Sequence, residues 1–191
     1  MAQPDFADCL IGGTVKRLLT GGQTHVLAAA LLSNPKDDVC LTCFTFGEDE
    51  PSVPLITALG RAAKCARVQV LADERESLTG KTKRQAHCLF NLVQLGVQVE
   101  LVKKPGAGQQ HSKTMRIGHT LILGSANWTS NSRKSYEMDL CVELDDQGQK
   151  WYQTKTKPIS GDVDNLKFEA ALLDMNTNLS DTKTDHNTKG T

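Results

Sequence analysis

The chain contains no long hydrophobic run. Its longest apolar stretch, residues 26–32, is far shorter than the roughly 18 apolar residues that a membrane-spanning helix needs. The first residues carry Asp5 and Asp8 and lack a basic segment followed by an apolar one, which argues against a secretory signal. We therefore expect a protein of the cytoplasm or of another soluble intracellular compartment, and we do not expect it to bind membranes.

Patterns that bind metals are also scarce. Of the six cysteines, only Cys40 and Cys43 form a C-x-x-C pair. They lie in a segment rich in β-branched and aromatic residues that predicts a strand, on which residues three apart point to opposite faces. No second C-x-x-C and no H-x-x-x-H pair follows. We expect reduced, mostly buried thiols and neither a metal nor another cofactor.

The net charge is zero, but the charges are unevenly distributed. Residues 61–137 carry 13 Lys and Arg against 5 Asp and Glu, whereas the segments on either side are acidic. A positive field around a site raises the local concentration of anionic substrates. The basic block therefore favours an anionic substrate, although solvated basic helix faces would give the same count.

Predicted strands alternate with predicted helices along the chain. This order indicates an α/β fold with a mixed β-sheet flanked by helices on both faces. The length suits one domain over residues 1–175, and residues 176–191, which are almost free of apolar side chains, are expected to be disordered. Residues 74–80 and 127–136 are expected to be polar connections. The expected strands are 39–46, 68–72, 97–102, 112–117, 120–124 and 137–144, and the expected helices are 15–19, 24–32, 53–64, 82–95 and 163–173.

One short stretch carries most of the functional information. His111 and Lys113 are two residues apart, so they share one face of a predicted strand. The next predicted strand ends in Gly124-Ser125-Ala126-Asn127, and Glu137 follows ten residues later. An imidazole, an ammonium, a hydroxyl and a carboxamide would then converge on one point. This set suits a phosphodiester, which needs one nucleophile and several donors for its non-bridging oxygens.

The order of these residues resembles the motif of the phospholipase D superfamily, H-x-K-x-x-x-x-D followed by G-S-x-N. The resemblance covers about residues 25–151 and is closest to members with a single motif, the bacterial endonucleases and the branch of Zucchini and mitochondrial cardiolipin hydrolase. One position departs from the pattern, because Ile117-Gly118 stands where the motif has its aspartate. In the family this aspartate mainly supports the site, so its absence concerns local geometry more than chemistry.

The nucleophile of such a reaction would be His111. A neutral imidazole can attack phosphorus and form a phosphohistidine, which divides the displacement into two steps. The second ring nitrogen needs a partner that fixes the tautomer. Glu137 is the expected partner, and Asp139 on the same predicted strand is the alternative.

Other residues would bind the substrate. Lys113 and Asn127 are expected to hold the non-bridging oxygens, and Ser125 to add a hydroxyl donor. Trp128 would either stack on a base or serve as an anchor in the core or in a dimer interface. Candidates for contacts to flanking phosphates are Lys81, Lys83, Arg84, Lys103, Lys104, Arg116, Arg133 and Lys134.

A second histidine is needed as the general acid that protonates the leaving oxygen. His25, His87, His119 and His186 each lack a lysine two residues later. A homodimer supplies the second histidine if its twofold axis brings His111 beside the symmetry-related His111. Lys113 and Asn127 of both subunits would then take the place of a metal ion.

The sequence thus predicts a metal-independent phosphodiesterase, a nuclease acting on single-stranded nucleic acid through a phosphohistidine at a site formed across a homodimer. Two alternatives stay open: a phospholipid phosphodiesterase of the cardiolipin type, and a catalytically inactive relative that binds nucleic acid.

Overall fold

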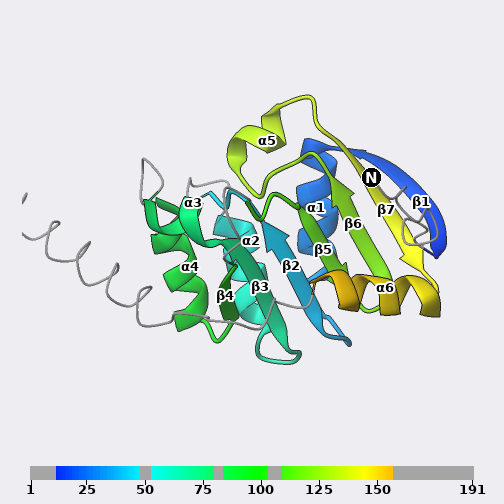
Figure 1. The fold of residues 1–191 in the computed structure, drawn as a ribbon, viewed down its shortest axis with the longest axis horizontal. Helices are drawn as coiled ribbons and strands as arrows, with labels where there is room; N and C mark the ends of the chain where they lie inside the picture. Colours follow the sequence, from blue (N-terminus) through cyan, green and yellow to red (C-terminus); the bar gives the residue numbers. More distant parts are fainter. Residues whose placement is uncertain (1–11, 48–52, 80–83, 103–108, 157–191) are drawn as a thin grey trace, which may run out of the picture.

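The computed structural model describes residues 12–47, 53–79, 84–102 and 109–156. A seven-stranded sheet runs through this part in the order β1-β7-β6-β5-β2-β3-β4 (Figure 1). The strands are β1 Gly13–Thr20, β2 Val39–Cys43, β3 Val68–Asp73, β4 Gln98–Val102, β5 Thr114–Ile117, β6 Thr120–Gly124 and β7 Met138–Leu144. The helices are α1 Gly21–Leu31, α2 Val53–Ala62, α3 Glu74–Thr79, α4 Arg84–Gln94, α5 Ser130–Lys134 and α6 Asp146–Thr156.

The sheet is mixed and is covered on both faces. β2, β3 and β4 pair in parallel, and all other neighbouring strands pair antiparallel. Buried residues of α1, α2 and α4 pack with one face of the sheet, and α6 contributes Tyr152 to a smaller cluster on the other face (Figure 1). The predicted α/β architecture is confirmed.

The helix expected at residues 15–19 is wrong, because these residues lie in β1. This strand pairs with β7 through Val15–Val142 and Leu18–Leu140, and a bulge separates the two pairs. The bulge adds one residue, so Val15 and Leu18 face the same side although they are three apart. This spacing imitates the period of a helix, and only the pairing with the distant strand β7 reveals the strand.

Three helices of the described residues, α3, α5 and α6, were not predicted from the sequence. Residues 74–79, expected to be a loop, form α3, and a short α5 lies within the expected connection 127–136. α6 follows β7 and begins next to Asp145, whose carboxylate accepts the N–H of Gly148 at 2.8 Å. The helix expected at 163–173 and the tail 176–191 lie outside the described residues, so they and the proposed domain boundary stay predictions.

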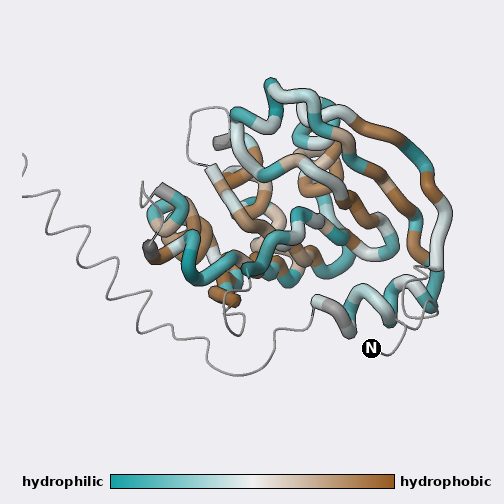
Figure 2. Tube along the Cα trace, turned by 45° about the horizontal axis from the view of Figure 1, so that its top comes forward, coloured by the Kyte–Doolittle hydropathy of each residue, from teal (hydrophilic) through white to brown (hydrophobic). Residues whose placement is uncertain are grey.

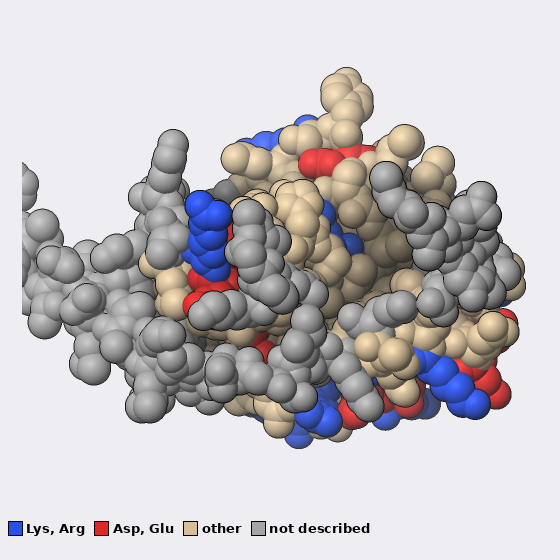
Figure 3. Space-filling model, in the orientation of Figure 1, with Lys and Arg blue, Asp and Glu red and all other residues tan. Residues whose placement is uncertain are grey.

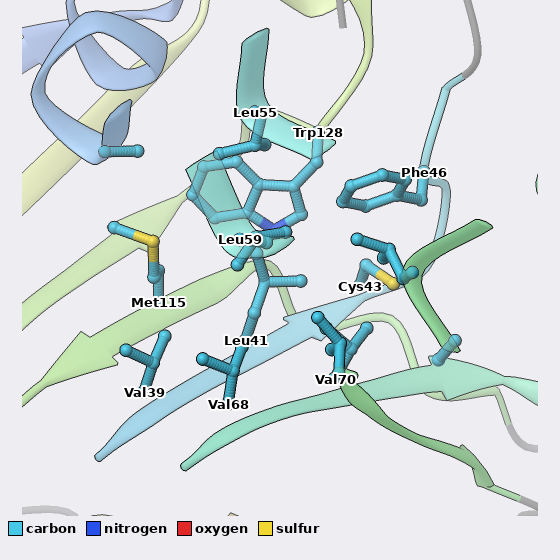
Figure 4. Close-up of a cluster of buried hydrophobic side chains, with 14 of the residues drawn as sticks. Val39, Leu41, Cys43, Phe46, Leu55, Leu59, Val68, Val70, Met115 and Trp128 are labelled. Atoms are coloured by element: carbon cyan, nitrogen blue, oxygen red, sulfur yellow. The ribbon is translucent and has the colours of Figure 1, made fainter. Parts of the chain in front are cut away.

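Trp128 belongs to the larger of the two hydrophobic core clusters. Hydrophobic residues concentrate in the central strands and in the helices that cover them (Figure 2), and all five residues of β2 are buried. Trp128 is 1% exposed, lies among side chains that include Phe46 and Leu59 (Figure 4), and donates its indole N–H to the carbonyl oxygen of Thr42 at 3.0 Å. Trp128 is therefore a core anchor, and its ring has no surface on which a base could stack.

Replacing Trp128 with alanine should lower the free energy of unfolding by about 3–5 kcal/mol, because it removes the largest buried side chain and leaves a cavity. Chemical denaturation of the wild type and the variant measures this change. Val93→Ala, at a 40% exposed helical position, is the control and should change stability little. A loss below about 1 kcal/mol for Trp128→Ala would contradict its role as a core anchor.

Candidate active site

Three strand ends meet at one edge of the sheet. β6 runs antiparallel to both β5 and β7, so its C-terminal end lies beside the beginnings of these two strands. The pairing of Gly124 with Asp139 fixes this register. The chain segments that adjoin these ends carry the five predicted catalytic residues, His111, Lys113, Ser125, Asn127 and Glu137.

Lys113 and His111 are in direct contact. Lys113 is 8% exposed, whereas His111 is exposed. Lys113 Nζ lies 3.1 Å from Nδ1 of His111 and donates to the His111 carbonyl oxygen at 2.8 Å. The ring of Phe44 lies 4.5 Å from the imidazole and 5.6 Å from the ammonium, so apolar surface borders the pair. Because an ammonium only donates, this contact requires a lone pair on the histidine nitrogen.

Two opposing effects act on the charge of Lys113. Burial lowers the pKa of Lys113 below its ordinary value of 10.5, because the charged form is poorly solvated there. The negative charge of Glu137 acts in the opposite direction but has the smaller effect. Glu137 is therefore coupled electrostatically to the residue that contacts His111.

The Glu137 carboxylate accepts a hydrogen bond from Ser125 rather than from the imidazole of His111. Ser125 Oγ donates to the Glu137 carboxylate at 2.5 Å and accepts the N–H of Met138 at 3.1 Å. The sequence had suggested Glu137 as the partner of the second ring nitrogen of His111, but the hydrogen bond found here goes to Ser125. The hydroxyl hydrogen of Ser125 is consequently engaged, and it can reach a substrate oxygen only if it leaves Glu137.

Asp139, the alternative histidine partner, has a different task. It is 2% exposed, and its carboxylate accepts the hydroxyl of Thr24 at 2.5 Å and the N–H of Ala126 at 3.0 Å. A Cβ at Gly124 would collide with this carboxylate and with the carbonyl oxygen of Met138. The glycine of the G-S-x-N turn is thus required by the close approach of Asp139, which holds the turn to α1.

The backbone of Asn127 is held on both sides. Its N–H donates to Ser132 Oγ at 3.0 Å, and its carbonyl oxygen lies 3.2 Å from Nε2 of the buried His25. The side chain is half-buried, and its buried Oδ1 has no hydrogen-bond partner within the described part of the chain. A carboxamide with unused hydrogen-bonding capacity is therefore fixed at the site.

Gly118 occupies the position of the missing aspartate. It has a φ of +53° and closes the turn between β5 and β6. A Cβ there would come within 2.6 Å of the Asp37 carboxylate. This turn lies at the opposite end of β5 from Lys113, so the departure from the family motif is remote from the edge where the five residues gather.

The predicted basic groove is described only in part. Arg133 and Lys134 lie on α5, which follows the G-S-x-N turn. Arg116 lies near the far end of β5, donates to the carbonyl oxygen of Gly118 and lies over the ring of Tyr152, which places it away from the site. The side chains of Lys81, Lys83, Arg84, Lys103 and Lys104 lie outside the described residues.

Sequence reasoning missed several supporting residues. Thr24 and His25 on α1 hold the turn that carries Asn127, and Phe44 borders the histidine. Asp73 accepts the N–H of Gln110. Asp73, a carboxylate directly after the expected strand 68–72, was a usable signal, whereas Phe44 lies inside the expected strand 39–46 and the contributions of α1 depend on packing between elements far apart in the sequence.

The described segments hold neither a metal-binding cluster nor a membrane-spanning helix. Within residues 12–47, 53–79, 84–102 and 109–156, no three His, Cys, Asp or Glu side chains cluster closely enough to hold a metal ion. No helix in these segments has the length and apolar composition to cross a membrane.

Comparisons with known proteins agree with this fold. Residues 29–157 match the family model described as cardiolipin synthase, PLD-like domain. The fold is similar to that of the phospholipase D family member Nuc from Salmonella typhimurium (TM-score 0.56, 16% identity, covering 75% of this chain and 90% of that chain). NucT from Helicobacter pylori gives a TM-score of 0.54 at 18% identity, covering 73% of this chain and 90% of that chain. Phosphatidylserine synthase from Haemophilus influenzae gives a TM-score of 0.63 at 13% identity, covering 78% of this chain and 39% of that chain. A search of curated protein sequences found no match.

The ionisation of Lys113 offers a direct test of its environment. We expect its side-chain NMR resonance to titrate below pH 10.5 in the folded protein, because burial disfavours the ammonium, and to return to the ordinary value in denaturant. Glu137→Gln should lower the midpoint further, because it removes the carboxylate that favours the charged form. A midpoint at or above 10.5 in the folded protein would contradict the burial of this group.

Proposed function

This chain belongs to the phospholipase D-like family of phosphodiesterases, and we propose that it is a metal-independent nuclease that cleaves single-stranded nucleic acid at a site formed across a homodimer. The proposal is supported by two features: the segments that carry His111, Lys113 and Asn127 adjoin the same end of β5 and β6, and Lys113 contacts His111 there. The basic block of residues 61–137 supports a polyanionic substrate.

The contact between Lys113 and His111 suggests how a substrate would activate the site. A phosphodiester oxygen carries negative charge, so it is a stronger acceptor for the ammonium than a neutral imidazole. Binding would draw Lys113 to a non-bridging oxygen and release the ring nitrogen that it contacts. Asn127 would donate to the second oxygen. Both donors would stabilise the charge of the transition state.

The reaction would proceed in two displacements. His111 attacks phosphorus, an N–P bond forms, and the bond to the leaving oxygen breaks as the partner's His111 gives that oxygen a proton. The partner's His111 then removes a proton from water, whose oxygen attacks phosphorus and breaks the N–P bond. The product phosphate leaves, and both histidines return to their initial states.

Exposed apolar side chains beside the site support the homodimer. Leu18 on β1 and Met138 on β7 are 67% and 70% exposed, and Tyr136 is exposed as well. Val15, also exposed, extends this apolar surface along β1 toward its other end. Leu18 opposes Leu140 in the register, so Leu18 and Met138 face the same side of the sheet. In Figure 3 the face that carries α6 is hollowed above this helix. Apolar surface of this kind marks an interaction site, and Met138 adjoins Glu137 in the chain.

Cleavage of labelled single-stranded DNA and RNA in excess EDTA tests the activity. Wild-type protein should cleave at least one polymer, and His111→Asn should abolish cleavage because asparagine cannot form the phosphoenzyme, while the fold and the dimer stay intact. Equal cleavage by His111→Asn would refute the assigned nucleophile, and loss of wild-type activity in EDTA would refute the metal-independent mechanism.

A phospholipid is the second candidate substrate, because the matching family model bears the name of cardiolipin synthase. Cardiolipin vesicles therefore belong in the same assay. Release of phosphatidate without cleavage of either polymer would replace the nuclease proposal. Salt-sensitive binding of nucleic acid without any product would indicate an inactive binding protein.

The shared site is tested by mixing subunits. If each reaction needs His111 from both copies, a fully exchanged equal mixture of wild type and His111→Asn should retain about a quarter of the wild-type activity, because only wild-type pairs remain competent. About half would show that each copy acts alone. Leu18→Glu combined with Met138→Glu should give monomers in light scattering and lose activity, whereas Val93→Glu on α4 should leave the dimer intact.

A further inference from the structure

We infer that Asp73, which lies outside the H-x-K and G-S-x-N motifs, is a positioning residue that holds His111 in place through the backbone of the preceding residue. The role of His111 as nucleophile rests on the proposed function, but its positioning by Asp73 can be measured without any substrate.

Asp73 is a buried carboxylate with both oxygens in use. It is the last residue of β3 and is 2% exposed. One oxygen accepts the N–H of Glu76 at 2.8 Å and thereby caps the first turn of α3. The other accepts the N–H of Gln110 at 2.7 Å. A buried carboxylate is costly unless such bonds satisfy it, so these two donors account for its presence in the interior.

His111 needs an anchor of this kind because the sheet does not hold it. The hydrogen-bonded pairing of β5 with β2 begins at Thr114, opposite Thr42, three residues after His111. Asp73 secures the residue before His111, and a bond of 3.0 Å from Ser112 Oγ to Thr42 Oγ1 secures the residue after it. His111 thus lies between two neighbours that are hydrogen-bonded to other strands, and of these two bonds the one to Asp73 is charge-assisted. The direct bond from the Lys113 ammonium to the His111 carbonyl oxygen joins His111 only to a residue of the same segment.

The chemistry of a carboxylate separates this role from helix capping. A serine at the same position would cap α3, since serine is a preferred capping residue, but its single hydroxyl is too short to reach Gln110 as well. Only a side chain with two acceptor oxygens serves both N–H groups at once. Asp73→Ser therefore removes the Gln110 anchor selectively.

The first measurement is NMR of the full-length chain. In Asp73→Ser, the amide resonance of Gln110 should shift and exchange faster with solvent, and the ring resonances of His111 should change with it. Asp145→Ser is the matched control, because Asp145 caps α6 in the same way at a distance from the site, and it should leave both sets of signals unchanged. Unchanged His111 signals in Asp73→Ser would overturn the inference.

The second measurement is kinetic and uses the same variants. Asp73→Ser should lower kcat by about 10- to 100-fold with KM changed less than about twofold, because a misplaced nucleophile slows the reaction more than it weakens binding. The inference would be overturned if the loss of kcat/KM came from a proportionate rise in KM. It would also be overturned if kcat stayed unchanged although the Gln110 resonance had shifted. If wild-type protein cleaves no substrate while the His111 signals respond to Asp73→Ser, the proposed function fails and the positioning role stands. Should Asp73→Ser not fold, the isosteric Asp73→Asn, which loses one acceptor, takes its place in both measurements.

Discussion

The whole site depends on the antiparallel register of β5, β6 and β7. These three consecutive strands pair as neighbours, so the C-terminal end of β6 lies between the N-terminal ends of β5 and β7. Every predicted catalytic residue lies within a few positions of these ends. The strands themselves carry none of the five predicted catalytic side chains. They act as a rigid frame, and the reactive groups lie on the short segments that enter and leave it, where backbone N–H and carbonyl groups need partners other than the sheet.

Buried polar side chains supply those partners. Asp139 holds the turn after β6 to α1, and Asp73 holds the segment before β5 to the end of β3. Both are 2% exposed, and each accepts two hydrogen bonds. A buried carboxylate that is satisfied in this way specifies one geometry, because any displacement leaves an unpaired charge in the interior. The segments that carry the candidate site are accordingly positioned by buried carboxylates outside the two motifs.

Much of the fold was predictable from local patterns. The helix 53–64, the strand 68–72 and the pair of strands after His111 have clear periods and stop signals, and they appear nearly as expected. β1 was not predictable, because its bulge produces a helical spacing and its partner β7 is more than a hundred residues away. At the candidate site, the position of the segments that carry His111, Lys113 and Asn127 at one end of β5 and β6 followed from strand order. Two hydrogen bonds, from Ser125 to Glu137 and from Thr24 to Asp139, depend on side-chain packing, which the spacing of residues in the sequence does not reveal.

The two-residue turn at Gly118 has an effect far from its own location. Ile117 pairs with Thr120 directly across it, so the turn permits only one alignment of β5 with β6. A slip of a single residue would exchange the two faces of β6 and would point its core side chains toward the opposite layer. Gly118, which stands where the family motif has its aspartate, therefore sets the strand register of the site. This register decides which side chains of β6 face the helices and where the G-S-x-N turn begins.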